Sequence, residues 1–247
     1  MVEPDPCQPP TDVAGLLLAA GRGRRMGAPK GLLRLEPGSP TLVELAVARL
    51  RAGGCARVLC VVGAAAERVA PLAESAGADV VVAPDWAKGM GASLRVGLAR
   101  VARLTPPYVA ALVTLVDLPD VSEAVVSRVL RDAAPAPGRL ARAAYGGRPG
   151  HPVLLGSDHW PAAAAGATGD RGARDLLRGA DVRLIECGDL AAGRDLDRPE
   201  DLTGGHSSSS SVHVSPTASM VDTDAPMRSG SQGGIGSAAP MWRRTSP

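Results

Sequence analysis

Four cationic residues, Arg22, Arg24, Arg25 and Lys30, follow Gly21 within nine positions, separated by glycines and a proline. Glycines allow backbone N–H groups to approach a ligand closely and to form an anion-binding concavity. The cations add positive charge around it, and Lys30 can contact a phosphate as a point charge. The stretch predicts an anion-binding loop. Taken alone, it is also compatible with a solvated basic turn.

The spacing within this loop does not match two common phosphate-binding loops. A Walker A loop needs Gly-Lys-Ser/Thr, which is absent, and the dinucleotide fingerprint needs Gly-x-Gly-x-x-Gly, whereas three residues separate Gly23 from Gly27. The loop therefore predicts a different mode of binding to phosphate.

Aspartates of interest lie in two later places. Asp117 follows an apolar run and precedes a turn stiffened by Pro119, so we expect it at the carboxyl edge of a sheet. An ordinary turn or helix-capping aspartate is the alternative there. In an extended segment, alternation would place Asp195 and Asp197 on one face. Asp201 is interpreted as a charge at a helix start beside Pro199.

The strands and helices that position these residues are indicated by short apolar runs that alternate with longer amphipathic runs. Such alternation predicts an α/β three-layer sandwich with a mostly parallel, Rossmann-like sheet. The expected strands are 13–19, 57–62, 79–83, 108–116, 140–144, 152–155 and 182–186. The expected helices are 41–52, 64–76, 92–104, 122–133, 157–163 and 173–178.

The domain boundaries follow from changes in composition. Residues 1–12 hold four prolines and predict a flexible arm, 13–204 form the domain, and 205–247 open on a serine run that predicts a disordered tail. A net charge of only +2 argues against a nucleic-acid partner. The longest apolar run is too short to span a bilayer, and the acidic, Pro-rich start is unlike a signal peptide. We expect a cytoplasmic protein without a zinc site or disulfide framework.

Six motifs in order resemble the MobA-like nucleotidyltransferases, and within them the molybdenum cofactor cytidylyltransferase branch. The first is Leu-Ala-Ala-Gly-x-x-x-Arg-Met-Gly-x-x-Lys at 18–30, with Gly23 where the family commonly has Ser. The others lie at 89–98 (Gly-Met-Gly-Ala-Ser-Leu-Arg-Val-Gly-Leu), 117–120 (Asp-Leu-Pro-Asp), 147–152, 169–174 and 195–202. Together they cover about residues 13–202.

The resemblance implies a role for each candidate residue. It implies nucleotide binding by Leu18, Ala19, Ala20, Gly21, Arg22, Gly23, Arg24, Lys30 and Ser93, and catalysis by Lys30, Asp117 and Arg25. It implies Mg²⁺, or Mn²⁺ in its place, on Asp117 and Asp197 with Asp195 close by, because Mg²⁺ prefers one or two carboxylates beside phosphate oxygens. It implies an acceptor site at His151, Arg171 and Arg174.

Some of these residues have a structural alternative. Ser93 follows a Gly-x-Gly turn and can instead cap the helix through Leu98. His151 can be a structural histidine before a strand, and Arg171 and Arg174 can belong to a solvated helix start. A general base is not needed, because a phosphate nucleophile is already anionic.

The implied reaction transfers CMP from CTP to the phosphate of the molybdopterin cofactor and releases pyrophosphate. The implied partners are a molybdenum-hydroxylase-type enzyme that receives the cofactor and its maturation chaperone. Alternatives are a related nucleotidyltransferase using GTP or a sugar phosphate, a nicotinamide-dependent oxidoreductase on a Rossmann-like fold, and a non-catalytic nucleotide-binding module. The missing Gly-x-Gly-x-x-Gly argues against the oxidoreductase.

Overall fold

The structure is a computed structural model that describes residues 12–179, 181–198 and 200–203. Of the predicted arm over 1–12 it describes only Asp12, whose carbonyl accepts a hydrogen bond from the Val109 N–H at 3.0 Å. The predicted tail over 205–247 lies outside the described residues.

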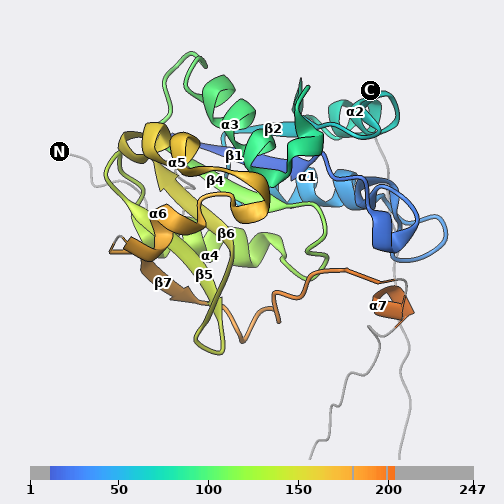
Figure 1. Cartoon of the computed structure of the whole chain (residues 1–247). Helices are drawn as coiled ribbons and strands as arrows, with labels where there is room; N and C mark the ends of the chain where they lie inside the picture. The colour runs from blue at the N-terminus through green and yellow to red at the C-terminus, as the bar shows by residue number, and fades with distance from the viewer. Residues whose placement is uncertain (1–11, 180, 199, 204–247) are drawn as a thin grey trace, which may run out of the picture. The chain divides into compact units, whose positions relative to one another are not determined.

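A seven-stranded sheet in the order β3-β2-β1-β4-β6-β5-β7 runs through the described residues (Figure 1). Its strands are β1 (Val13–Ala19), β2 (Arg57–Val62), β3 (Asp79–Val82), β4 (Ala110–Leu115), β5 (Leu140–Tyr145), β6 (Arg148–Gly156) and β7 (Arg183–Glu186). Only β6 is antiparallel, to both β4 and β5. The predicted mostly parallel sheet is confirmed.

Helices cover both faces of this sheet, as Figure 1 shows. The α-helices are α1 (Leu42–Ala52), α2 (Ala66–Ser75), α3 (Met90–Val101), α4 (Glu123–Ala133), α5 (Trp160–Gly166), α6 (Arg174–Gly179) and α7 (Glu200–Thr203). Short 3₁₀ helices are η1 (Arg24–Met26), η2 (Lys30–Leu32), η3 (Trp86–Lys88), η4 (Ser157–His159) and η5 (Gly169–Arg171). None of the described helices is long and apolar enough to cross a membrane.

Strand β1 shows why the apolar runs lie in the centre of the sheet. Leu17 packs on the face covered by α1, α2 and α4, whereas Leu16 and Leu18 pack on the face covered by α3 and α5. Because successive side chains point to opposite faces, a strand between two helical layers must be apolar at every position. The predicted three-layer sandwich is therefore correct.

Two local expectations are wrong. Helix α3 begins at Met90 with Gly89 as its N-cap, so Ser93 lies inside the helix, buried, and does not cap it. Strand β6 begins at Arg148 rather than at residue 152, so His151 is a strand residue and not one that precedes a strand. Pairing with β5 at Tyr145 and Ala144 extends β6 through a segment that is poor in strand-forming residues.

Helix α1 starts with a capping box. The Glu44 N–H donates to Thr41 Oγ1 at 3.5 Å, and the Thr41 N–H donates to Glu44 Oε2 at 2.7 Å. We expect Thr41→Val to lower the free energy of unfolding by about 1 kcal/mol, because it leaves an N–H at the helix start without its acceptor. Urea denaturation measures the difference.

Helix α4 offers a matched control. Its N-cap Ser122 makes no side-chain capping bond, so Ser122→Ala should cost less than Thr41→Val. Equal losses in the two variants would contradict the assigned role of the Thr41 hydroxyl.

Candidate nucleotide-binding and catalytic site

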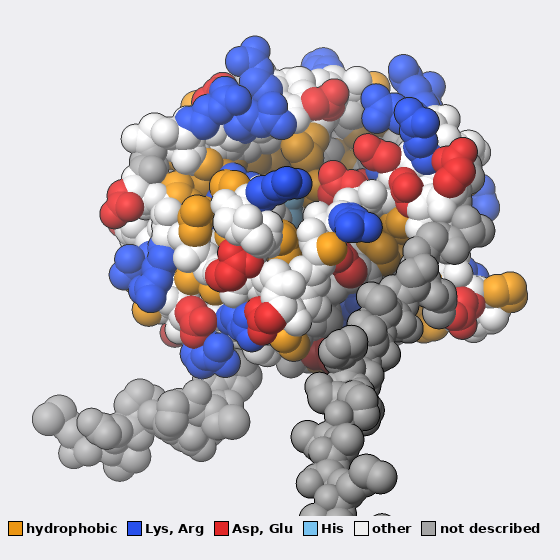
Figure 2. Space-filling view, turned by 90° about the horizontal axis from the view of Figure 1, so that it is seen from below, with side chains coloured by type: hydrophobic (Ala, Val, Ile, Leu, Met, Phe, Trp, Pro, Cys, Tyr) orange, Lys and Arg blue, Asp and Glu red, His pale blue; other side chains and the backbone are white. Residues whose placement is uncertain are grey.

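A cleft of about 600 Å³ lies at the carboxyl ends of β1 and β4. The loop after β1 forms one side of it, η3 and the start of α3 form the other, and Asp117 after β4 lies at its floor. Figure 2 shows a hollowed face with apolar side chains on the wall, Lys and Arg around the rim, one group of acidic side chains at the right and further acidic side chains across the face. The carboxyl edge of an open α/β sheet is where such folds bind ligands.

Lys30 links two carboxylates that are far apart in the sequence. Its Nζ donates to Asp117 Oδ2 at 2.7 Å and to Asp197 Oδ1 at 2.9 Å. The side chains of Lys30 and Asp117 are both 17% exposed, whereas that of Asp197 is 52% exposed. Burial lowers the pKa of Lys30, but the bonds and charges of the two aspartates outweigh it and raise the pKa above its ordinary value. Lys30 is therefore a fixed cation in the cleft.

The segment 188–198 returns from β7 and brings Asp197 to this site. Asp120 Oδ2 accepts hydrogen bonds from the N–H groups of Ala192 and Gly193, both at 2.8 Å. Further along, the Leu196 N–H donates to the carbonyl of Asp117 at 2.9 Å. These bonds connect the segment to the loop after β4, so they set the position of Asp197 relative to Lys30.

Asp201 holds the end of this segment. Its Oδ2 accepts the N–H groups of Asp197 and Arg198 at 2.9 and 2.8 Å, and these bonds lower its pKa. Asp201 thus serves the local backbone at the start of α7, as expected for a charge at a helix start.

The carboxylates near Lys30 fit a divalent cation. Asp117 Oδ1 is buried and has no hydrogen-bond partner among the described residues. Burial, together with the charges of Asp117 and Asp197, raises the pKa of Asp195, so these acidic groups crowd one another. No group of three or more potential ligands among the described residues forms a complete metal cage. Such a set suits a cation that also takes substrate oxygens.

The loop after β1 turns sharply into η1. Gly23 has φ +64°, and a Cβ there would collide with the carbonyl oxygen of Ala28, so only glycine fits. Arg25 on η1 reaches Asp197 Oδ2 at 3.7 Å, with both groups exposed. Arg22 lies over the ring of Trp86, 5.1 Å from its centroid. The loop thus surrounds the cleft with cationic side chains.

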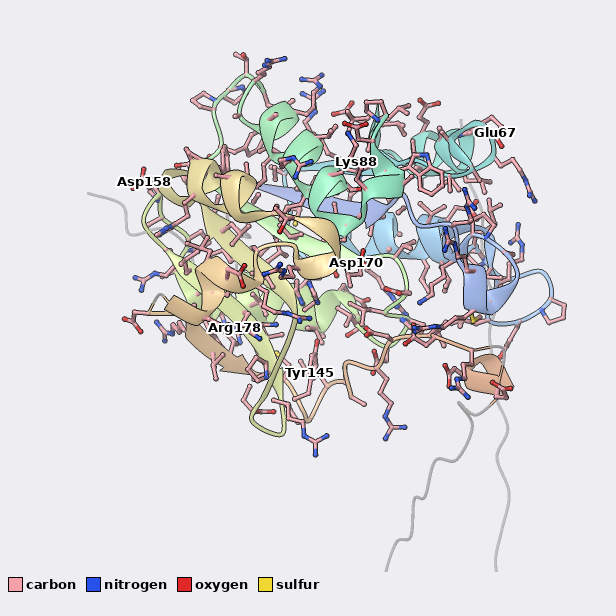
Figure 3. The ribbon with its side chains drawn as sticks, in the orientation of Figure 1. Glu67, Lys88, Tyr145, Asp158, Asp170 and Arg178 are labelled. Atoms are coloured by element: carbon pink, nitrogen blue, oxygen red, sulfur yellow. The ribbon has the colours of Figure 1, made fainter. Side chains whose placement is uncertain are left out.

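The opposite side of the cleft is formed by the start of α3. The Met90 N–H donates to Asp170 Oδ1 at 3.3 Å, and Figure 3 shows the labelled Asp170 beside the start of this helix. A Cβ on Gly89 would meet the backbone of Gly169, so the two turns approach closely. Ser93 lies one turn further, buried, and lines the cleft.

A second, smaller pocket of about 120 Å³ adjoins the cleft and shares Leu18 and Met90 with it; we call it the side pocket. The structure brings His151, Arg171 and Arg174 together there, away from Lys30, together with Arg142 of β5. Burial first, and the charge of Arg142 second, lower the pKa of His151 to about 4. His151 is therefore neutral at physiological pH.

The sequence did not single out four residues that the structure places at these sites. Trp86 and Asp170 line the cleft, Arg142 lines the side pocket, and Asp120 holds the segment 188–198. A signal existed for Asp120, which ends the Asp-Leu-Pro-Asp motif. Arg142 also had a signal in the sequence, because it is a cation inside an otherwise apolar strand.

The low pKa of His151 has a measurable consequence. The unfolded chain binds a proton at this residue below about pH 6.5, but the folded chain only below about 4, so folding stability falls as pH drops through that window. We expect this residue to contribute a loss of about 3 kcal/mol. His151→Asn should flatten the pH dependence of urea denaturation between pH 4 and 6.5. An unchanged slope in the variant would contradict it.

Comparison with known families identifies the domain. The model of the MobA-like NTP transferase domain matches residues 15–186. The chain is also 40% identical, over 200 residues, to a protein named nicotine blue oxidoreductase from Paenarthrobacter nicotinovorans, covering 77% of this chain and 94% of that protein.

Solved structures agree with the family match. Rv0371c from Mycobacterium tuberculosis H37Rv superposes with a TM-score of 0.63 at 30% identity, over 78% of this chain and 96% of that one. Its complex with manganese superposes at 0.60 and 28% identity, over 75% and 94%. A nucleotidyl transferase from Methanothermobacter thermautotroptrophicus shares the fold, with a TM-score of 0.65 at 21% identity over 77% and 94%.

Proposed function

Because the chain belongs to the MobA-like NTP transferase family, we propose that it transfers CMP from CTP to the terminal phosphate of the molybdopterin cofactor. The observation that carries nucleotidyl transfer is the Lys30 ammonium held between Asp117 and Asp197 at the floor of a cleft rimmed by the glycine-rich cationic loop. The arrangement is suited to a triphosphate, which needs both cations and, through a metal, carboxylates.

In this proposal Lys30 and the loop from Gly21 to Gly27 hold the triphosphate. The backbone N–H groups of the loop and the side chains of Arg22 and Arg24 face the phosphates, and Ser93 contacts the nucleoside. The bond to the α-phosphorus forms from an oxygen of the acceptor phosphate, while the bond to the bridging oxygen of pyrophosphate breaks. Lys30 and Arg25 neutralise charge on the phosphates as the pyrophosphate leaves.

Asp117 and Asp197 would hold the metal, with Asp195 beside them. A bound Mg²⁺ or Mn²⁺ supplies further charge neutralisation on the triphosphate oxygens. Asp117 Oδ1 has no hydrogen-bond partner among the described residues, which supports this assignment, as does the relative solved with manganese. Lys30 bonds to both carboxylates and holds them near each other, and its hydrogen bond and charge lower the pKa of Asp197.

The acceptor would lie in the side pocket, at His151, Arg171 and Arg174. Its position beside the cleft, with Leu18 and Met90 in common, supports a phosphate acceptor next to the α-phosphate. A molybdenum-hydroxylase-type enzyme and its chaperone are the partners of such a reaction. The free cysteines of the described chain, Cys55, Cys60 and Cys187, support action in a reducing compartment such as the cytoplasm.

The name of one relative supports a second candidate function. Nicotine blue oxidoreductase is 40% identical to this chain. A nicotinamide-dependent oxidoreductase is also one of the alternatives to a nucleotidyltransferase that the sequence leaves open. In that case the cleft would take a nicotinamide dinucleotide and a small electron acceptor. The absent Gly-x-Gly-x-x-Gly remains evidence against it.

Thermal unfolding separates the two functions. CTP, GTP, ATP and NADPH are each added with and without Mg²⁺; a ligand at 100 times its dissociation constant adds about 2.7 kcal/mol, or about 5–10 °C for a domain of this size. A rise with CTP above GTP that depends on Mg²⁺ is expected, followed by pyrophosphate release with molybdopterin. A rise in the unfolding temperature with NADPH alone would favour the oxidoreductase function over nucleotidyl transfer.

A further inference from the structure

The side pocket combines apolar walls with positive charge. Side chains of α3, β4 and β6 form the walls, among them Leu94, Val113, Val153 and Leu155. The polar side chains in its lining are all cationic or imidazole groups, namely Arg142, His151, Arg171 and Arg174. Within the described residues, no carboxylate, amide or hydroxyl side chain lines it.

Arg142 is the most constrained of these groups. Its Nε and Nη2 donate to the carbonyl of Gly150 at 3.1 and 3.0 Å. These bonds hold the guanidinium across the β5–β6 pair beside His151, and they leave Nη1 for a ligand. A guanidinium fixed by two bonds to the backbone loses little freedom when it binds an anion.

The positive charge in the side pocket is only partly balanced by ion pairs within the described residues. Arg142 and Arg174 make no ion pair among the described residues, whereas Arg171 lies 3.6 Å from Asp175. Burial lowers the pKa of Arg142, and the charge of Arg174 lowers it further, so these two guanidinium groups repel each other. Arg142 is half-buried and Arg174 is exposed, so a bound anion would relieve their repulsion and offset the cost of burying the Arg142 charge.

We propose that Arg142, with Arg174, selects the acceptor by binding an anionic group, and that the acceptor has an apolar or heteroaromatic body with few hydroxyl groups. This inference rests on the proposed nucleotidyl transfer and narrows its acceptor class. A sugar phosphate is disfavoured, because among the lining side chains only the neutral imidazole of His151 can accept a hydrogen bond, so most buried hydroxyls would lack a side-chain acceptor. The anionic group satisfies the two guanidiniums, and the body covers Leu94, Val153 and Leu155.

Isothermal titration calorimetry on the full chain tests this with two phosphate monoesters. The probes are 1-naphthyl phosphate, with an apolar body, and glucose 1-phosphate, with a hydroxylated one. We expect the naphthyl ester to bind at least about tenfold more tightly. Equal affinities, or a preference for the sugar phosphate, would overturn the proposed acceptor class.

Variants locate the binding. Arg142→Gln and Arg174→Gln should each lower the affinity for 1-naphthyl phosphate by about tenfold or more. Arg178→Gln, on the same helix as Arg174 but outside the lining, is the matched control and should not change the affinity; Figure 3 labels this residue on α6. Arg174 is exposed, so its variant keeps the test valid if Arg142→Gln is unstable. Full affinity in both variants would overturn the inference.

These titrations contain no nucleotide, so they test the anion site in the side pocket separately from the proposed nucleotidyl transfer. If CTP gives no thermal shift but naphthyl phosphate binds through Arg142, nucleotidyl transfer is wrong and the anion site stands. If CTP raises the unfolding temperature while both side-pocket variants bind 1-naphthyl phosphate normally, nucleotidyl transfer is supported and the inferred anion site is wrong. Arg24→Gln, on the nucleotide loop, should leave the naphthyl affinity unchanged; a loss there would place the probe in the cleft and overturn the inference.

Discussion

Lys30→Met is expected to lower kcat/KM for pyrophosphate release by about 10³-fold. The substitution removes the only group that bonds to both Asp117 and Asp197 in the described structure, and with it a cation preorganised toward the phosphates. Removing one such preorganised donor typically costs 10²–10³-fold. The variant also leaves two carboxylates facing each other and the incoming triphosphate, so nucleotide binding should weaken even without metal.

The control for this variant is Arg131→Met, which removes an exposed cation of α4 that pairs with its neighbour Asp132. Its kcat/KM should stay close to that of the unsubstituted protein. Thermal unfolding of both variants shows whether the fold is retained. A folded Lys30→Met protein with normal turnover would contradict the assigned role of the ammonium.

Asp117→Asn is expected to abolish the metal dependence of the reaction. The amide has the same shape and can still accept the Lys30 hydrogen bond through its oxygen, but it removes the negative charge and replaces one carboxylate oxygen with a donor. Mg²⁺ requires anionic oxygen ligands beside the phosphates, so turnover should fall by about 10³-fold or more.

The readouts for Asp117→Asn differ from those for Lys30→Met. Any rise in unfolding temperature with nucleotide alone should remain in this variant, while the rise that depends on Mg²⁺ or Mn²⁺ should disappear. Asp158→Asn, an exposed position on η4 labelled in Figure 3, is the matched control and should keep both effects. A metal-dependent rise that survives Asp117→Asn would place the cation elsewhere.

Sequence periodicity was sufficient for the core of the fold but not for its edges. Strands β1 and β2 have the predicted bounds, because each is apolar at every position that two helical layers cover. Strand β6 was predicted too short, since its first residues, Arg-Pro-Gly-His, extend only because β5 pairs with them. Pairing between distant segments is a tertiary effect that local propensity does not contain.

The part of the candidate site that follows adjacent parallel strands could be predicted from the sequence. Residues that follow β1 and β4 must meet at one edge of a parallel sheet, so Lys30 and Asp117 could be placed together. Direct contact of Lys30 with Asp197, across 167 positions, depends on how the segment 188–198 returns from β7. Arg142 stands out in the sequence as a cation in an otherwise apolar strand, but its burial and its bonds to Gly150 depend on how β5 and β6 pair.

The late position of Asp197 has a consequence for synthesis of the protein. Chains emerge from the ribosome N-terminus first, and a domain generally folds as a unit. The cationic loop and Asp117 come out well before the segment 188–198, which supplies Asp197. Until that segment has been synthesised, Lys30 lacks one of its two carboxylate partners. The charge balance around Lys30 is completed among the last steps of translation of this domain, and so is the proposed catalytic site.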